Sequence, residues 1–269
     1  MQDFFSTMIA ALETAGEIHL KYLGSLDEIR YKDKHNPVTR ADEESEKAII
    51  DTIRKKFPNH SFLAEESGGH SIDKSGYLWI IDPLDGTVNF SHSFPIFGPS
   101  VALMIDGAIE MGGVYNPCYK EMFYATKGKG AFFNKKPIRV SKIETLDDAV
   151  LVTGFPYDRH KRAHHYCVIL EEFLHRAQGV RRVGAASLDL CSIACGRLDG
   201  FWEEKLNPWD TAGGWIILEE AGGKVTDFSG NEYNIFLPQI VATNGKIHNE
   251  VVQILKKYTD EIYDKETKT

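Results

Sequence analysis

Cysteine is scarce in this sequence, and its spacing excludes several kinds of site. The chain has 269 residues and only four cysteines. No two of them form a C-x-x-C pair, and no histidine cluster accompanies them at the spacing of a zinc site. We therefore expect small, buried, reduced thiols in a reducing compartment. The four residues are Cys118, Cys167, Cys191 and Cys195.

Long apolar runs and an excess of basic residues are also missing. The longest apolar runs are too short to cross a bilayer, and residues 1–15 lack the basic and apolar pattern of a secretory signal. The net charge of −8 argues against a general nucleic-acid-binding protein, which would carry a basic face. The nearest basic stretch, HKRAHH at 160–165, is more typical of a solvated helix start. These absences predict a soluble, cytoplasmic protein that binds neither membranes nor nucleic acid directly.

The order of the predicted elements indicates a mixed α/β fold. Residues 98–140 form short apolar runs separated by turn residues, with a strong hairpin signal at Asp106-Gly107, so we expect an antiparallel meander there. After about residue 148, predicted strands and helices alternate, which is typical of an α/β layer with crossover connections.

The sequence shows no internal repeat, low-complexity tract or flexible linker. We therefore expect one domain over residues 1–269, in which an N-terminal half of about 1–145 and a C-terminal half of about 146–269 share one compact body.

A helix is predicted ahead of the meander. Ile49, Ile53 and Phe57 recur at helical spacing. Thr39, three residues before Asp42, resembles a capping box at the start of this helix. The polar stretch just before it, at 31–39, is expected to be a loop or a loose hairpin.

The stretch LWIIDPLDGT at 78–87 joins an apolar strand to two aspartates. Asp82 ends the predicted strand, and Pro83 is expected to stop further strand pairing. The chain then turns, so that Asp85 can face the same point as Asp82. Two carboxylates this close repel each other at pH 7 unless one is protonated or a cation lies between them. Oxygen ligands, with the carbonyl of Leu84 available, suit Mg²⁺ better than zinc.

The residues that follow favour an anion beside this cation. Gly86 and Thr87 open a helix or a tight turn, whose backbone N–H groups can hold phosphate oxygens. One short loop could thus bind a metal and a phosphate side by side. The alternative is an Asp-Pro turn with an aspartate at a helix N-cap.

Two more acidic segments could contribute to the same site. Glu65 and Glu66 follow a strand-like run, and Asp210 directly precedes an apolar helical segment. The alternatives are a surface charge pair for the two glutamates and a helix N-cap for Asp210.

Taken together, the segments resemble one known family. AEES at 64–67, DPLDGTVNF at 82–90 and NPWDTAGG at 207–214, in that order, look like the inositol monophosphatase family. NPVTRAD at 36–42 and VGAASLDLCSIACGRLDGFWE at 183–203 match its pattern as well. The resemblance therefore extends over nearly the whole chain, and its motifs are far more specific than a lone glycine motif.

The resemblance implies a fold and an activity. The fold is a layered α-β-α-β-α sandwich, commonly dimeric. The activity is the hydrolysis of phosphate monoesters with two or three Mg²⁺ ions, often inhibited by lithium. The implied substrate is inositol-1-phosphate, with fructose 1,6-bisphosphate as a further possibility, and water attacks without a covalent intermediate.

The resemblance also implies roles for individual residues. Thr87 and Glu65 would orient the attacking water, and Asp42 would accept a hydrogen bond from the threonine hydroxyl. The spacing from Thr39 also explains Asp42 as a helix-start acid. The implied metal ligands are Glu65, Asp82, Leu84 (through its carbonyl), Asp85 and Asp210. The implied substrate contacts are Asp85, Gly86, Thr87, Ala186, Glu203 and Asp210.

Other functions stay open at this point. A nucleotide 3′(2′),5′-bisphosphate phosphatase is disfavoured by Val88-Asn89, because that branch commonly has Lys-Glu there. A regulatory protein that works through a protein partner could use the same fold. The segment 181–183 and Tyr157 could contact a second phosphate or a sugar, or could be surface charges and core packing.

Overall fold

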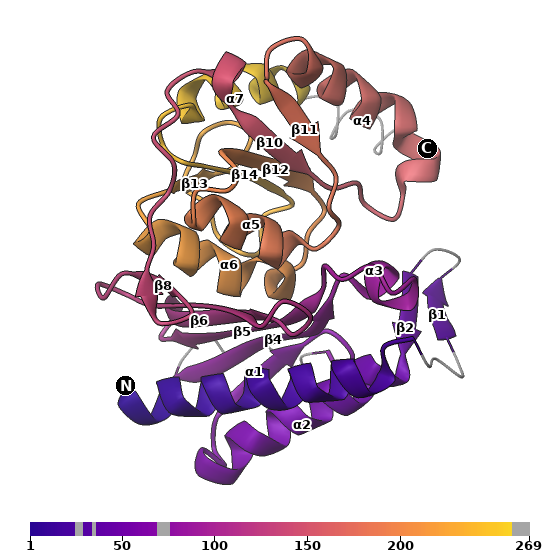
Figure 1. The fold of residues 1–269 in the computed structure, drawn as a ribbon, viewed down its shortest axis with the longest axis vertical. Helices are drawn as coiled ribbons and strands as arrows, with labels where there is room; N and C mark the ends of the chain where they lie inside the picture. Colours follow the sequence, from indigo (N-terminus) through magenta and orange to yellow (C-terminus); the bar gives the residue numbers. More distant parts are fainter. Residues whose placement is uncertain (25–28, 34–35, 69–75, 260–269) are drawn as a thin grey trace.

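Two β-sheets alternate with three layers of helices in this protein (Figure 1). The computed structural model describes residues 1–24, 29–33, 36–68 and 76–259. The layers follow the order helices, larger sheet, helices, smaller sheet, helices. The predicted mixed α/β class and the α-β-α-β-α layering are confirmed.

The first helical layer covers one face of the larger sheet. It consists of α1 (Gln2–Tyr22) and α2 (Arg40–Lys56), which lie side by side in Figure 1. Met8, Leu12 and Ala15 of α1 are buried at helical spacing, so the apolar stripe of this helix faces the sheet.

The segment between these helices forms a hairpin. Strands β1 (Ile29–Asp33) and β2 (Asn36–Thr39) pair antiparallel, which selects the hairpin of the two predicted alternatives; the intervening part of the 31–39 stretch lies outside the described residues. The predicted capping box between Thr39 and Asp42 at the start of α2 is confirmed.

The larger sheet contains the predicted meander. Its strands are β3 (Ser61–Ala64), β4 (Tyr77–Asp85), β5 (Gly98–Ile105), β6 (Ala108–Asn116), β7 (Glu121–Thr126), β8 (Ala131–Phe133) and β9 (Lys136–Pro137). They lie in sequence order, and every neighbouring pair from β4 to β9 is antiparallel. At the β5–β6 hairpin, Asp106 and Gly107 have φ values of 49° and 84°, which a two-residue hairpin turn of this type requires.

The C-terminal half supplies the remaining layers. The middle layer is α5 (Ala186–Ala194) with α6 (Pro208–Glu220), and the outer layer is α4 (Arg159–Leu174) with α7 (His248–Leu255). The smaller sheet has the order β11 (Gly179–Arg181), β10 (Val150–Thr153), β12 (Gly200–Glu204), β14 (Gln239–Thr243) and β13 (Lys224–Thr226). Short 3₁₀ turns lie at Leu146–Asp148 and Lys256–Tyr258.

The smaller sheet confirms the predicted crossovers. Strand β10 is parallel to both β11 and β12, because a helix follows β10 and another follows β11 before the chain returns to the sheet. Apolar side chains of α5 and α6 pack against both sheets, so the middle layer joins the two halves of the chain into one continuous core.

The end of β4 differs from the prediction in one respect. Pairing with β5 was expected to stop at Pro83, but β4 continues to Asp85, which pairs with Gly98. The ladder is only interrupted between Asp82 and Asp85, and a short helix, α3 (Thr87–Ser91), follows at once. A local bulge thus accommodates the proline without ending the strand.

All four cysteines are free, and Cys191 is buried as predicted. The prediction of burial is wrong for Cys167, which is exposed on α4.

Among the described residues, no helix is both long and apolar enough to cross a membrane.

Candidate active site

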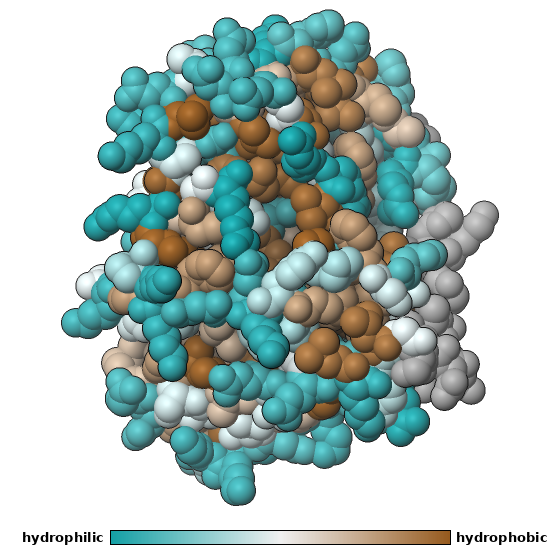
Figure 2. Space-filling model, viewed as in Figure 1, coloured by the Kyte–Doolittle hydropathy of each residue, from teal (hydrophilic) through white to brown (hydrophobic). Residues whose placement is uncertain are grey.

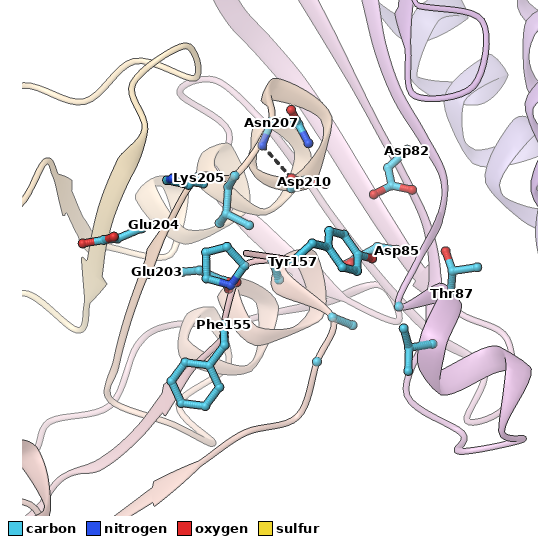
Figure 3. Close-up of a pocket in the computed structure, with 18 of the residues that line it drawn as sticks. Asp82, Asp85, Thr87, Phe155, Tyr157, Glu203, Glu204, Lys205, Asn207 and Asp210 are labelled. Carbon is cyan, nitrogen blue, oxygen red and sulfur yellow. Dashed lines mark hydrogen bonds between the residues drawn. The ribbon is translucent and has the colours of Figure 1, made fainter. Parts of the chain in front are cut away.

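A cavity of about 400 Å³ lies where the two halves of the chain meet. The end of β4 forms one wall, and the start of α6 and the end of β12 form the other (Figure 3). Every predicted site residue except Asp42 lines this cavity. These lining residues are Glu65, Asp82, Leu84, Asp85, Gly86, Thr87, Ala186, Glu203 and Asp210.

The interrupted β4 ladder presents two buried carboxylates. Asp82 accepts a hydrogen bond from the amide of Leu84 at 2.9 Å, which closes the turn around Pro83. Asp85 accepts two bonds from Ser187 at the start of α5, from the backbone amide at 2.7 Å and from the hydroxyl at 2.6 Å. The second aspartate is therefore anchored to the other half of the chain.

Asp210 reaches the same cavity from α6. It was predicted to stand directly before this helix, but the helix begins two residues earlier, at Pro208, so Asp210 lies within the first turn. The amide of Asn207 donates to its carboxylate at 2.6 Å (Figure 3). The predicted cap at this helix start thus exists, but Asn207 is the N-cap residue and Asp210 is its partner.

Burial and mutual repulsion raise the pKa values of these acids. Burial is the largest cause for Asp82, and Glu65, Asp85 and Asp210 add to it by charge repulsion. The pKa of Asp210 is raised well above its usual range by burial and then by Glu65. Burial raises the pKa of Asp85 to about 6 in spite of its two bonds from Ser187. The ionised forms of these acids are therefore unfavourable in the metal-free cavity, and a bound cation would stabilise them.

The donor set fits a hard divalent cation. Carboxylate and carbonyl oxygens are the ligands that Mg²⁺ prefers, and the four acids converge on one cavity and repel one another. Among the described residues, no three His, Cys, Asp or Glu side chains are already grouped closely enough to hold a metal ion. Local hydrogen bonds from Leu84, Ser187 and Asn207 each engage one oxygen of Asp82, Asp85 and Asp210.

The predicted contact between Thr87 and Asp42 is present. The hydroxyl of Thr87 lies 3.1 Å from an oxygen of Asp42 and 3.1 Å from the carbonyl of Leu84. The other oxygen of Asp42 accepts bonds from the amide and the hydroxyl of Thr39. Asp42 thus makes the contacts of both interpretations at once, the capping box and the link to Thr87. Burial is the main cause that raises its pKa, to about 7.

Two glycines of the cavity wall stand where a side chain would clash with a neighbouring oxygen atom. Gly86 has a φ of 88°, and a Cβ there would come within 3.0 Å of the carbonyl of Ile96. A Cβ on Gly154 would lie 2.0 Å from the carboxylate of Glu203. Burial raises the pKa of Glu203 to about 8, and the charge of Arg182 opposes that rise.

Basic and aromatic side chains lie at the cavity. Arg182 and Tyr157 both line it and are exposed. Arg182 is thus a surface charge that also faces the cavity, and Tyr157 is not part of the packed core. Burial is the main cause that raises the pKa of Tyr157, and the four clustered acids raise it further. Tyr157 therefore stands neutral over the acidic end of the cavity (Figure 3).

The basic stretch at 160–165 is more than a solvated helix start. It lies in the first turns of α4, where Arg162 and His165 approach the buried carboxylate of Glu204 at 3.3 and 3.0 Å. Lys205, in turn, lies 2.8 Å from Asp158. These contacts tie the start of α4 to the end of β12 and so fix the rim of the cavity.

Sequence reasoning missed three residues that support the site. Ser187 holds Asp85, as described above. His19 of α1 is fully buried, and its Nε2 lies 2.9 Å from the carbonyl of Pro83. Glu46 of α2 accepts the amides of Glu66 and Ser67. The available signal was a polar residue on an apolar helix face, four residues after Ala15 for His19 and three before Ile49 for Glu46.

The fold and the cavity define a class. This is a layered α/β protein in which four acids from both halves of the chain surround a cavity beside a helix start. The model of the inositol monophosphatase family matches residues 1–260. The chain belongs to that family and is a phosphatase, as its sequence motifs predicted.

Individual relatives agree with this assignment. The inositol-1-monophosphatase of Synechocystis sp. is 41% identical, covering 95% of this chain and 89% of the relative. The fructose-1,6-bisphosphatase/inositol-1-monophosphatase of Thermotoga maritima is 39% identical, covering 97% and 98%. A putative Nus factor SuhB of Neisseria meningitidis is 40% identical, covering 96% and 100%. The solved structure of the Thermotoga maritima IMPase TM1415 superposes with a TM-score of 0.88 at 38% identity, covering 97% and 99%.

Proposed function

We propose that this protein hydrolyses phosphate monoesters with Mg²⁺, and that its main substrate is inositol-1-phosphate. One observation carries the proposal. The acids of the cavity come from distant parts of the chain, and they lie beside the Gly86-Thr87 turn, whose amides can hold phosphate oxygens. Relatives named for inositol monophosphatase activity support the choice of substrate.

The proposed ligands of two or three Mg²⁺ ions are the side chains of Glu65, Asp82, Asp85 and Asp210 and the carbonyl of Leu84. Bound Mg²⁺ would lower the pKa of water and stabilise the negative charge that develops on the phosphoryl oxygens.

The chain's own residues would position the reactants. The Thr87 hydroxyl donates its proton toward Asp42, so its lone pairs are available to accept a proton from the attacking water. Glu65 would hold the same water from the turn that follows β3. The amides of Gly86 and Thr87 would fix the phosphate, and no side chain needs to form a covalent intermediate.

The leaving alcohol would occupy the other end of the cavity. Glu203 and Ala186 both line the cavity, and we assign the Glu203 carboxylate and the Ala186 amide to substrate hydroxyl groups. Asp85 and Asp210 would contact the substrate from the metal side. We also propose that the protein acts in the cytoplasm as a homodimer.

The proposal is tested first on the unmodified protein. With Mg²⁺ present, phosphate release from inositol-1-phosphate should be at least ~100-fold faster than with EDTA, because water attack needs the cation. A colorimetric phosphate assay over a panel of inositol, sugar and nucleotide phosphates measures this. If no ester in the panel releases phosphate, the regulatory function suggested by the name of the Neisseria relative replaces the enzymatic one.

Fructose 1,6-bisphosphate is the second candidate substrate, and Arg182 favours it. In the described residues, no hydrogen bond or ion pair engages its guanidinium, which packs over Gly184, where a Cβ would lie 2.1 Å from Nη1. The guanidinium lines the cavity on the side of Glu203. A cation at that place can pair with a second phosphate on the substrate.

Arg182→Gln should therefore raise the KM for fructose 1,6-bisphosphate about tenfold, the loss of one charge-assisted pair. The KM for inositol-1-phosphate should change less than about threefold, because that substrate has no second phosphate. Arg181→Gln is the matched control, since this neighbour bonds to the carbonyl of Val180 and does not line the cavity. Equal changes in KM on both substrates would remove Arg182 from this role.

A further inference from the structure

Glu46 is a buried acid whose carboxylate bonds to backbone amides of another segment of the chain. It lies on α2 with only 5% of its surface exposed. One carboxylate oxygen accepts the amide of Glu66 at 2.7 Å, and the other accepts the amide of Ser67 at 2.9 Å. Both carboxylate oxygens thus bond to the backbone of a turn that is distant in sequence.

The turn that Glu46 holds begins at Glu65. It follows β3 and closes with the amide of Gly68 bonded to the carbonyl of Ala64 at 3.0 Å. The amide of Glu65 itself bonds to the carbonyl of Ile81 on β4 at 3.2 Å. The backbone of Glu65 is therefore fixed on one side by the sheet and on the other by the carboxylate of Glu46.

The same face of α2 also contacts Thr87, which lines the cavity. Asp42 lies four residues before Glu46, one helical turn away, and accepts the bond from Thr87. A single helix face therefore contacts both segments whose side chains are proposed to orient the water. A rigid helix is a precise support for two groups that must stay in register.

We infer that Glu46 is a positioning residue that fixes the Glu65 turn relative to Thr87 and so sets the geometry of the metal and water site. The inference rests on the proposed function, in which Glu65 is a metal ligand. Glu46 acts through the backbone amides of Glu66 and Ser67. This role requires a carboxylate with both oxygens at the present distance from the helix backbone.

Two substitutions separate reach from charge. Glu46→Gln keeps the size but turns an –NH₂ group toward one backbone N–H, so one of the two bonds is lost. Glu46→Asp keeps the negative charge but shortens the side chain by one methylene. Glu43→Gln, on the exposed side of the same helix, is the control for simple loss of charge.

The readouts are Mg²⁺ affinity by isothermal titration calorimetry and steady-state kinetics on inositol-1-phosphate. We expect both Glu46 variants to weaken Mg²⁺ binding by about 10-fold or more and to lower kcat by a similar factor, as for other residues that orient metal ligands. Glu43→Gln should stay within about twofold of the unmodified protein. Circular dichroism confirms that each variant is folded.

Three results would overturn the inference. If Glu46→Asp binds Mg²⁺ as tightly as the unmodified protein, only the charge matters. If both variants lower the free energy of unfolding but leave Mg²⁺ affinity and kcat unchanged, Glu46 is merely structural. If the unmodified protein binds no Mg²⁺, the proposed function fails, and the inference fails with it.

Discussion

Asp85→Asn should lower Mg²⁺-dependent phosphate release by at least ~10³-fold, or about 4 kcal/mol of transition-state stabilisation. The side chain is buried, faces the other acids and is one of the two carboxylates presented by the β4 bulge. An amide has no charge to neutralise a bound cation, so both metal binding and the stabilisation of the phosphoryl oxygens should suffer.

The same substitution should leave the metal-free fold intact. The amide oxygen of asparagine can still accept the two bonds from Ser187, and a source of repulsion with Glu65 disappears. Urea unfolding in EDTA should therefore give a free energy of unfolding equal to or slightly above that of the unmodified protein.

Asp51→Asn is the matched control, because this aspartate is exposed on α2 and pairs with Lys47 at the surface. Its activity should stay within about twofold of the unmodified protein. The account of Asp85 is wrong if the Asp85→Asn variant keeps more than about a tenth of the normal activity while the control behaves as expected.

Local sequence rules predicted those features of the fold and the site that depend on neighbouring residues alone. The capping box of α2 and the hairpin turn at Asp106-Gly107 are of this kind, and both are present. The prediction that strand pairing ends at Pro83 was wrong, because the cost of a missing N–H depends on the partner strand, which the local sequence does not reveal. The bulge on β4 absorbs that cost.

Residues that act across the fold were harder to find. The contact between Asp42 and Thr87 came from the family resemblance, not from spacing, and it is observed. His19 bonds to the carbonyl of Pro83, and Glu46 bonds to amides of the Glu65 turn. Every residue has a carbonyl and nearly every residue has an amide, so the identity of such a partner cannot be predicted from its residue type. Only their position on apolar helix faces distinguishes them.

The largest effect on stability should come from the metal itself. The acids have pKa values above those of an unfolded chain, about 8 for Glu203, 7 for Asp42 and 6 for Asp85, chiefly through burial. The folded metal-free protein thus binds more protons than the unfolded chain, and it loses stability as the pH rises from 6.5 to 8. Burial lowers the pKa of His19 and His248, so below pH 6.5 these histidines change the stability with pH in the opposite direction. The effect of the acids is therefore best measured between pH 6.5 and 8.

A cation that binds only the folded protein offsets this loss. At a Mg²⁺ concentration ~100 times its Kd, the stabilisation is about 2.7 kcal/mol per site, which raises the Tm of a chain of this size by ~5–10 °C. The gain should be greater at pH 8 than at pH 6.5, because the ionised acids that bind Mg²⁺ are then the dominant form.

Thermal unfolding at pH 8, in EDTA and then with increasing Mg²⁺, tests most directly whether the acids of the two halves form one cation site. The account predicts a Tm that rises with Mg²⁺ concentration in the unmodified protein and rises far less in Asp82→Asn and Asp210→Asn. A Tm that is indifferent to Mg²⁺, or that rises equally in all three proteins, would show that these carboxylates do not share a bound cation.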